Sequence, residues 1–257
     1  MATYIDSHAH LTSPEVLPFL TQALQRASAA GVSHMLNICT DASSLHKGIA
    51  LAKEKPFIRN AGATTPHDVE EEGDSAFPMF EEAAIRGDLC AIGETGLDYY
   101  YKNLPKDLQK RLLVRYLHLA QRVHLPVIFH CRDAFADLFS IVDTEYKGPA
   151  ILHCFTGTAE EASMVLERGW YLSLSGIVTF KKSEALRDIA KMTPLAQLLI
   201  ETDTPYLAPQ SHRGKQNEPA YLPETAQCLA AVKEISVAEV ANATSENARK
   251  LFGFFSC

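Results

Sequence analysis

The chain has 257 residues, a hydrophobic fraction of 47% and a formal net charge of −7 at pH 7. The negative charge counts against a basic protein that coats nucleic acid non-specifically, and no apolar run approaches the roughly 20 residues needed to cross a bilayer. The N-terminus has neither the basic nor the apolar segment of a signal peptide, and the six cysteines form no CxxC pair, so we expect a cytoplasmic protein with free thiols.

Apolar segments rich in Val, Ile, Leu, Phe and Cys alternate with helical patterns along the whole chain. Several of these segments lack a clean polar–apolar alternation, as strands buried on both faces do. The predicted strands are residues 3–7, 33–39, 57–63, 89–93, 126–130, 149–153, 170–174 and 197–201. The predicted helices are residues 14–30, 42–53, 75–86, 106–124, 133–145, 159–168 and 183–192, followed by two helices within 223–250.

Capping residues set several helix boundaries. Pro14 is expected to open the first helix and Gly31 to end it, because proline suits the first turn and glycine the position after the last. Asp41 is a candidate N-cap of the second helix, and Ser236 marks the break between the last two. The longest irregular stretch, residues 203–222, is rich in proline, and a long ordered loop of this kind is often functional.

Eight alternating β and α units without a composition shift predict an α/β protein with a single (β/α)8 TIM barrel over residues 1–257. The alternative is an open, doubly wound sheet. No GxGxxG or P-loop pattern follows the first predicted strand, which weakens that alternative.

Candidate metal ligands recur where the predicted strands end. His8 and His10 are two positions apart, so on a strand their side chains point the same way. The later candidates are Glu94, His130, His153 and Asp203, with Glu201 beside Asp203. Barrel active sites lie at the carboxyl ends of the strands, so these groups are expected to converge.

Four imidazoles and two carboxylates suffice for two metals if one carboxylate bridges, and Glu94 comes from the middle strand of the set. Nitrogen-rich ligation favours Zn²⁺, Mn²⁺ or Fe²⁺ over Mg²⁺, although the ligands alone leave the metal open. Taken singly, each residue has a structural explanation: His130 and His153 as capped histidines, Glu94 in an ion pair with an arginine, and Asp203 as a turn cap. The six together favour a metal-dependent hydrolase.

Six segments, in order across nearly the whole chain, resemble the TatD family of metal-dependent deoxyribonucleases, a branch of the amidohydrolase superfamily. They are Asp6-Ser7-His8-Ala9-His10, Gly93-Glu94-Thr95-Gly96-Leu97-Asp98-Tyr99-Tyr100, His130-Cys131-Arg132-Asp133-Ala134, His153-Cys154-Phe155-Thr156-Gly157, Glu201-Thr202-Asp203-Thr204-Pro205-Tyr206-Leu207-Ala208-Pro209 and Arg213-Gly214-Lys215-Gln216-Asn217-Glu218-Pro219. Thr95 stands where the family more often has Ile or Val, a change that leaves the neighbouring ligand in place.

The resemblance implies a somewhat distorted TIM barrel with two divalent cations, Mg²⁺, Mn²⁺ or Zn²⁺. The first would be held by His8, His10, Glu94 and Asp203, and the second by Glu94, His130 and His153. The resemblance further implies 3′–5′ exonuclease action on single-stranded DNA, with RNA as an alternative substrate, and a role in DNA repair or nucleic-acid degradation. In this scheme Asp203 orients the attacking water and takes its proton, with Glu201 in support.

Several polar and aromatic residues near these ligands are candidates for holding the substrate. Arg132 is two residues past His130 and is suited to a phosphate oxygen, and Arg213 and Lys215, with His212, lie in the long loop where they can meet flanking phosphates. Tyr99, Tyr100 and Tyr206 are candidates for stacking on bases; packing at the barrel rim is an equally good explanation for them. No membrane contact and no obligate protein partner are indicated.

Two other functions remain open from the sequence. One is an amidohydrolase-type hydrolase of C–N or ester bonds, such as a D-aminoacyl-tRNA deacylase, because the fold alone cannot separate these chemistries. The other is a non-catalytic scaffold that kept a metal site, against which the complete ligand set and Glu201 argue.

Overall fold

The structure is a computed structural model that describes residues 2–101 and 104–254. Eight strands form one sheet whose spatial order, β1 to β8, is the order of the sequence, and the strand pairs are parallel. A doubly wound sheet would reverse its strand order partway. The predicted (β/α)8 TIM barrel is therefore confirmed.

The element boundaries follow the sequence prediction closely. The strands are β1 (Tyr4–Ala9), β2 (Val32–Cys39), β3 (Ile58–Gly62), β4 (Ala91–Asp98), β5 (Val127–Arg132), β6 (Ala150–Leu152), β7 (Tyr171–Leu174) and β8 (Leu198–Ile200). The α-helices are α1 (Leu20–Ala29), α2 (Ala42–Glu54), α3 (Gly73–Ile85), α4 (Lys106–Val123), α5 (Phe135–Glu145), α6 (Ala159–Glu167), α7 (Glu184–Met192), α8 (Leu222–Lys233) and α9 (Val237–Phe252). Short 3₁₀ helices are η1 (Leu17–Phe19), η2 (Gly176–Thr179), η3 (Leu195–Gln197), η4 (Gln210–His212) and η5 (Pro219–Tyr221).

The predicted cap of the second helix and the predicted break at Ser236 are confirmed, and two boundaries were wrong. The Asp41 side chain accepts the Ser44 amide at the start of α2, and Ser236 caps α9 in the same way. The first helix begins at Leu20 rather than at Pro14, because Pro18 lacks the amide hydrogen that an interior helical position needs. Strand β4 continues to Asp98 instead of ending at residue 93, so Glu94 lies within the strand.

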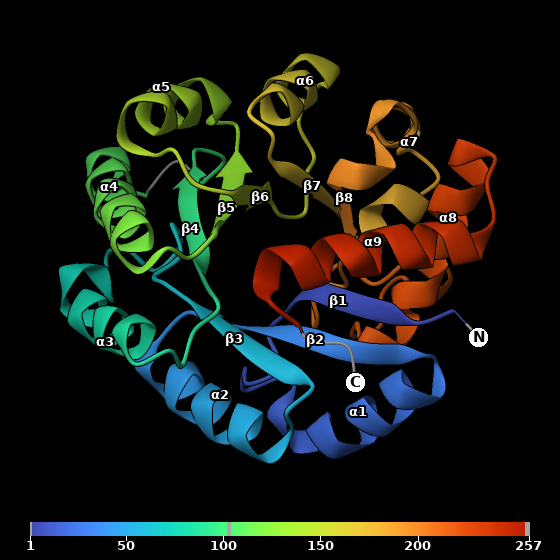
Figure 1. Ribbon diagram of the computed structural model, residues 1–257, viewed down its shortest axis with the longest axis horizontal. Helices are drawn as coiled ribbons and strands as arrows, with labels where there is room; N and C mark the ends of the chain where they lie inside the picture. Colours follow the sequence, from blue (N-terminus) through green and yellow to red (C-terminus); the bar gives the residue numbers. More distant parts are fainter. Residues whose placement is uncertain (1, 102–103, 255–257) are drawn as a thin grey trace. The chain divides into compact units, whose positions relative to one another are not determined.

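The chain divides into two compact units. The first unit comprises Met1–Asn37 and Cys154–Cys257. Within it, the end of β1 is bonded to the segment after β8: the Asp203 amide donates to the His8 carbonyl at 2.9 Å, and the His10 amide donates to the Thr204 carbonyl at 2.8 Å. Helix α9 packs along β1 and β8 (Figure 1). These bonds set the backbone positions of His8, His10 and Asp203.

The second unit comprises Ile38–His153 and contains β3 to β6. Its core includes the fully buried rings of Phe80, Tyr116 and Phe129, and helix α4 packs along β4 (Figure 1). Strand β4 approaches β5 very closely at Gly96, whose φ is +146° and where a Cβ atom would lie 1.9 Å from the His130 carbonyl oxygen. Only glycine fits such a position.

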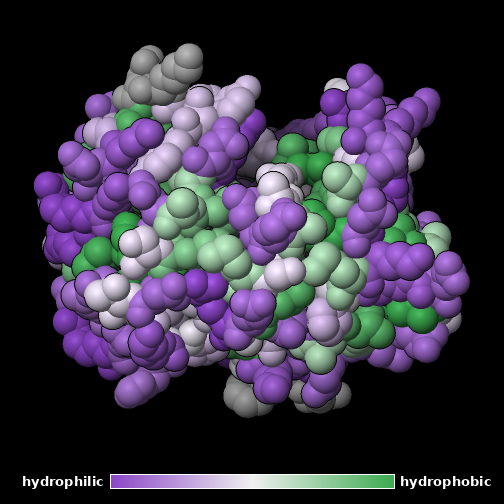
Figure 2. All heavy atoms as spheres, turned by 90° about the horizontal axis from the view of Figure 1, so that it is seen from above, coloured by the Kyte–Doolittle hydropathy of each residue, from purple (hydrophilic) through white to green (hydrophobic). Residues whose placement is uncertain are grey.

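The five cysteines within the described ranges form no disulfide, as the sequence predicted. None of the helices built from the described residues is both long and apolar enough to cross a membrane. Figure 2 shows a face on which hydrophilic side chains predominate and hydrophobic ones lie between them.

Candidate metal centre

The first unit brings three of the predicted ligands together. The Nε2 atoms of His8 and His10 are 3.3 Å apart, and they lie 3.7 Å and 3.5 Å from Oδ1 of Asp203. The His8 side chain is fully buried, whereas those of His10 and Asp203 keep 14% and 10% of their surface exposed. The expected alternation on β1 therefore aims both imidazoles at one carboxylate.

Asp6, which the sequence prediction did not single out, holds the segment that carries Asp203. Its carboxylate accepts the Thr202 amide at 3.0 Å and the Thr202 hydroxyl at 2.6 Å. Burial raises the pKa of Asp6 to about 7, although the hydrogen bonds from Thr202 act in the opposite direction. Side chains two positions apart along a strand point the same way, so Asp6, His8 and His10 share one side of the chain at β1. This spacing could have identified Asp6 from the sequence.

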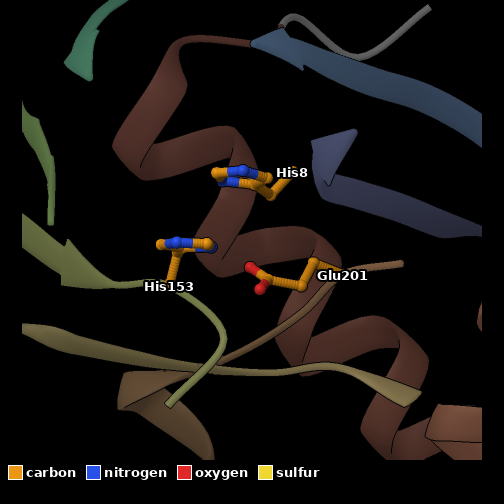
Figure 3. Close-up of side chains that lie close together, drawn as sticks. All are labelled: His8, His153 and Glu201. Atoms are coloured by element: carbon orange, nitrogen blue, oxygen red, sulfur yellow. The ribbon is translucent and has the colours of Figure 1, made fainter. Parts of the chain in front are cut away.

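Glu201 is fully buried at the end of β8 and lies in the same unit as His8. Figure 3 shows both side chains, with the Glu201 carboxylate projecting from the segment after β8. One carboxylate oxygen, Oε1, accepts the Cys154 amide at 2.6 Å. This short bond fixes the orientation of an acidic group two residues from Asp203.

The second unit brings together the other three predicted ligands. Oε1 of Glu94 lies 2.9 Å from Nδ1 of His130 and 2.9 Å from Nε2 of His153, and these two nitrogens are 3.3 Å apart. Three potential ligand atoms thus form a small triangle around a common point.

Asp98 orients this triangle and was missed as a site residue in the sequence. Its Oδ2 atom lies 3.0 Å from Nε2 of His130 and 2.9 Å from Nε2 of His67, while Oδ1 accepts the Tyr100 amide at 2.9 Å. Asp98 is four residues after Glu94 on one strand, so both point to the same side. His67 carried no sequence signal, because it comes from a loop.

Asp98 and His130 shift each other's pKa through the hydrogen bond between them. Burial favours a neutral Asp98, but hydrogen bonds from His130 and His67 outweigh it and hold the Asp98 pKa well below its usual range. Burial also lowers the pKa of His130, and its hydrogen bonds to Asp98 and Glu94 more than compensate, so that this pKa is raised. The same two carboxylates that favour a proton on His130 favour a metal cation beside it.

The geometry of both triads fits a divalent metal. Two imidazole nitrogens bound to one tetrahedral Zn²⁺ at about 2.0–2.1 Å lie about 3.3 Å apart. The nitrogen pairs His8–His10 and His130–His153 both have a separation of 3.3 Å. An ionised Asp98 keeps the proton of His130 on Nε2, which leaves the Nδ1 lone pair facing Glu94. Each unit therefore holds a histidine and carboxylate cluster compatible with metal binding.

The predicted substrate residues are placed as follows. In the first unit, Tyr206 is 52% exposed with its ring beside that of His10, and the Arg213 guanidinium lies over the Phe180 ring at 4.2 Å. Lys215 is exposed in the same loop. His212 is bonded to Glu224 at 2.9 Å and stacks on Tyr221.

In the second unit, Arg132 lies over the Tyr100 ring, with its guanidinium carbon 3.5 Å from the ring centroid. Tyr99 is engaged differently. Its hydroxyl donates to Asp137 at 2.6 Å, and the Lys106 amine lies over its ring at 4.0 Å.

Comparison with known proteins identifies the family. The model of the TatD-related DNase family matches residues 5–253. The uncharacterized metal-dependent hydrolase YabD of Bacillus subtilis is 36% identical over 249 residues, which covers 96% of this chain and 98% of YabD. The 3′-5′ ssDNA/RNA exonuclease TatD of Citrobacter rodentium is 34% identical over 256 residues, covering 96% of this chain and 97% of that protein.

Among solved structures, YjjV, a TatD homologue from Escherichia coli, superposes with a TM-score of 0.93 at 28% identity and covers 98% of this chain and 99% of that one. The chain therefore belongs to the TatD-related DNase family. It is a metal-dependent hydrolase with the TIM-barrel fold of that family.

Proposed function

We propose that this protein is a metal-dependent phosphodiesterase that shortens single-stranded DNA, and also RNA, from the 3′ end. The whole chain, residues 1–257, acts as a single hydrolase domain in this proposal. Its cellular role would be DNA repair or nucleic-acid degradation in the cytoplasm, without an obligate protein partner. Similarity to the 3′-5′ ssDNA/RNA exonuclease TatD of Citrobacter rodentium supports the substrate and the direction of cleavage.

The pair of ligand triads is the observation that carries the proposal. One triad comes from β1 and the segments just after β1 and β8, and the other comes from β4, β5 and the segment just after β6. In a TIM barrel the carboxyl ends of all eight strands face the same end of the barrel. We therefore propose that both triads serve one centre, which would hold two divalent cations of the Mg²⁺, Mn²⁺ or Zn²⁺ type with Glu94 as a shared ligand.

The cations, when bound, supply a water of lowered pKa and offset negative charge on the phosphate. Asp203 is suited to accept the proton of the attacking water, because its carboxylate retains solvent access. Glu201, fixed by the Cys154 amide, places a second acidic side chain two residues from Asp203 in the sequence. As the water oxygen bonds to phosphorus, the bond from phosphorus to the leaving sugar oxygen breaks.

The remaining polar residues hold the nucleic acid in this scheme. Arg132 has a planar guanidinium suited to phosphate, and Arg213 and Lys215 are exposed cations in the loop after β8. Tyr206 offers an exposed ring beside the ligand His10. This arrangement favours a phosphate-bearing substrate over a small neutral amide.

The test is a nuclease assay with end-labelled single strands. Purified protein with Mn²⁺ or Mg²⁺ should shorten a 5′-labelled oligonucleotide into a ladder, and EDTA should stop the reaction. A 3′-blocked strand should resist. Glu94→Ala and Asp203→Asn should lose this activity while retaining the wild-type circular dichroism spectrum.

Glu167→Gln, at an exposed carboxylate at the end of α6, is the matched control for the effect of a carboxyl substitution and should keep full activity. A contaminating nuclease would leave activity in the Glu94 and Asp203 variants prepared in the same way. The same preparation is assayed on ester and amide substrates, including D-aminoacyl-tRNA. Retained turnover on DNA in both active-site variants, or turnover confined to the ester and amide substrates, would overturn the proposal.

A further inference from the structure

Two exposed tyrosine rings, roughly perpendicular to each other, and an arginine lie together in the second unit. Tyr100 is 53% exposed and Tyr101 is 51% exposed, and their rings meet edge to face with centroids 5.1 Å apart. The guanidinium carbon of Arg132 lies 3.5 Å from the Tyr100 centroid and 5.8 Å from that of Tyr101. We call these three residues the stacking platform.

A series of ring contacts links the stacking platform to a proposed metal ligand. The Tyr101 ring meets His67 at a centroid distance of 5.6 Å, and His67 meets His130 at 4.8 Å. Asp98 ties the series together, since it accepts the Tyr100 amide through Oδ1 and bonds His67 and His130 through Oδ2. The platform is thus held at a set distance from the His130 imidazole.

The charge on Arg132 is available for a ligand. Among residues 2–101 and 104–254, no carboxylate forms an ion pair or hydrogen bond with Arg132. Lys110, another cationic residue of the second unit, is by contrast paired with Asp137 at 2.7 Å. Arg132 follows His130 by two positions on β5, so both side chains point to the same side of the strand.

We propose that the stacking platform binds one nucleobase of the substrate. The inference rests on the proposed nuclease function and adds a base-binding position to it. Bases stack on tyrosine rings and on the planar guanidinium of arginine, and such stacking tolerates any sequence because every base has a π face. The Arg132 guanidinium lies beside the Tyr100 and Tyr101 rings, and ring contacts through His67 connect these rings to the proposed ligand His130. This arrangement suits a nucleotide whose base stacks on the platform while its phosphate lies at the metal centre.

Tyr99 does not belong to the platform. It is less exposed than Tyr100 and Tyr101, and its hydroxyl is held by Asp137. We therefore assign base stacking to Tyr101, which the sequence prediction did not select, in place of Tyr99.

The test uses a set of oligonucleotides in which each member lacks one base, at a different distance from the 3′ end. Wild-type protein should show one position at which loss of the base lowers kcat/KM by roughly 5- to 150-fold, the range expected for one stacked base. The double variant Tyr100→Leu/Tyr101→Leu should lose this position effect, because the flat π faces are gone. The double variant Tyr100→Phe/Tyr101→Phe should keep it, since stacking requires only the rings.

Three outcomes overturn the inference. They are a wild-type protein equally active on every member of the set, a Leu pair that keeps the position effect, and a Leu pair whose kcat/KM falls equally on all members. The last result would indicate a structural role or a surface for another protein. If wild-type protein cleaves no oligonucleotide at all, the proposed function itself fails, so the two failures are distinguishable.

Discussion

Asp98 is the residue on which the second triad depends most. A neutral histidine binds a metal through the nitrogen that carries no proton, and its other nitrogen is usually held by a carboxylate. In this protein that carboxylate is Asp98, bonded to His130 at 3.0 Å. The backbone amides of Tyr100 and Tyr101 in turn fix the Asp98 carboxylate.

We predict that Asp98→Asn weakens metal binding about 10- to 100-fold, the range for loss of such a supporting carboxylate. The amide nitrogen would face Nε2 of His130 and drive its proton to Nδ1, the atom that should bind the metal. Calorimetric titration of metal-free protein with Mn²⁺ or Zn²⁺ measures the change. Asp137→Asn, which alters the half-buried carboxylate that accepts the Tyr99 hydroxyl, is the control. Equal affinity in wild type and Asp98→Asn would show that Asp98 is dispensable.

His34 makes stability depend on pH. Burial lowers its pKa from 6.5, and the charge of Arg249 lowers it further. Because the unfolded chain binds a proton at His34 more readily than the folded chain, protonation favours unfolding. The contribution of His34 to the free energy of unfolding is therefore complete above about pH 6.5 and decreases as the pH falls below that value.

We predict that wild-type protein loses more unfolding free energy between pH 7.5 and pH 5.5 than His34→Gln does. Urea titrations of both proteins at the two pH values measure the difference. If His34→Gln loses as much unfolding free energy as wild type between the two pH values, groups other than His34 cause the acid sensitivity.

At the scale of elements, the loop between β8 and α8 is the least regular part of the site. Asn217, only 1% exposed, organises it: its side-chain amide donates to the carbonyls of Thr202 and Tyr206 at 2.7 Å each. Its backbone amide also donates to the Pro205 carbonyl at 3.0 Å. One side chain thus holds both flanks of the turn that carries Asp203.

We predict that Asn217→Asp lowers the free energy of unfolding by about 2 kcal/mol or more, because two buried carbonyls lose their donor and face a carboxylate. The midpoint of thermal unfolding should fall by about 4–8 °C. Differential scanning calorimetry measures it, with Asn242→Asp on the exposed side of α9 as the control. A midpoint equal to that of the control would mean that the loop is held by other contacts.

The elements themselves could largely be predicted from the sequence, and the exceptions have physical causes. Buried parallel strands and capped helices have local signals, so most boundaries lie within a few residues of the structure. The segment Gly93-Glu94-Thr95-Gly96 resembles a turn locally, yet β4 continues through it. The glycines are required by the close approach of β5, a tertiary contact without a local signal.

At the scale of the whole molecule, the ligand groups were predictable because a TIM barrel gathers the carboxyl ends of its strands. Within one unit His8 lies with His10 and Asp203, and within the other Glu94 lies with His130 and His153. That all six serve one centre stays a prediction. Asp98 and His67 could not be assigned in the same way, since their role depends on contacts between segments far apart in sequence. Membership of the TatD-related DNase family agrees with the predicted fold and chemistry.

In the proposed function, Glu94 would join the two triads into one centre that holds two divalent cations. Native mass spectrometry of the Mn²⁺- or Zn²⁺-loaded protein measures the metal content per chain most directly. We predict two cations for wild type and fewer than two for Glu94→Gln, with loss of oligonucleotide cleavage in the variant. A wild-type protein that saturates at one cation, or a Glu94→Gln variant that retains two with unchanged affinity, would contradict the account.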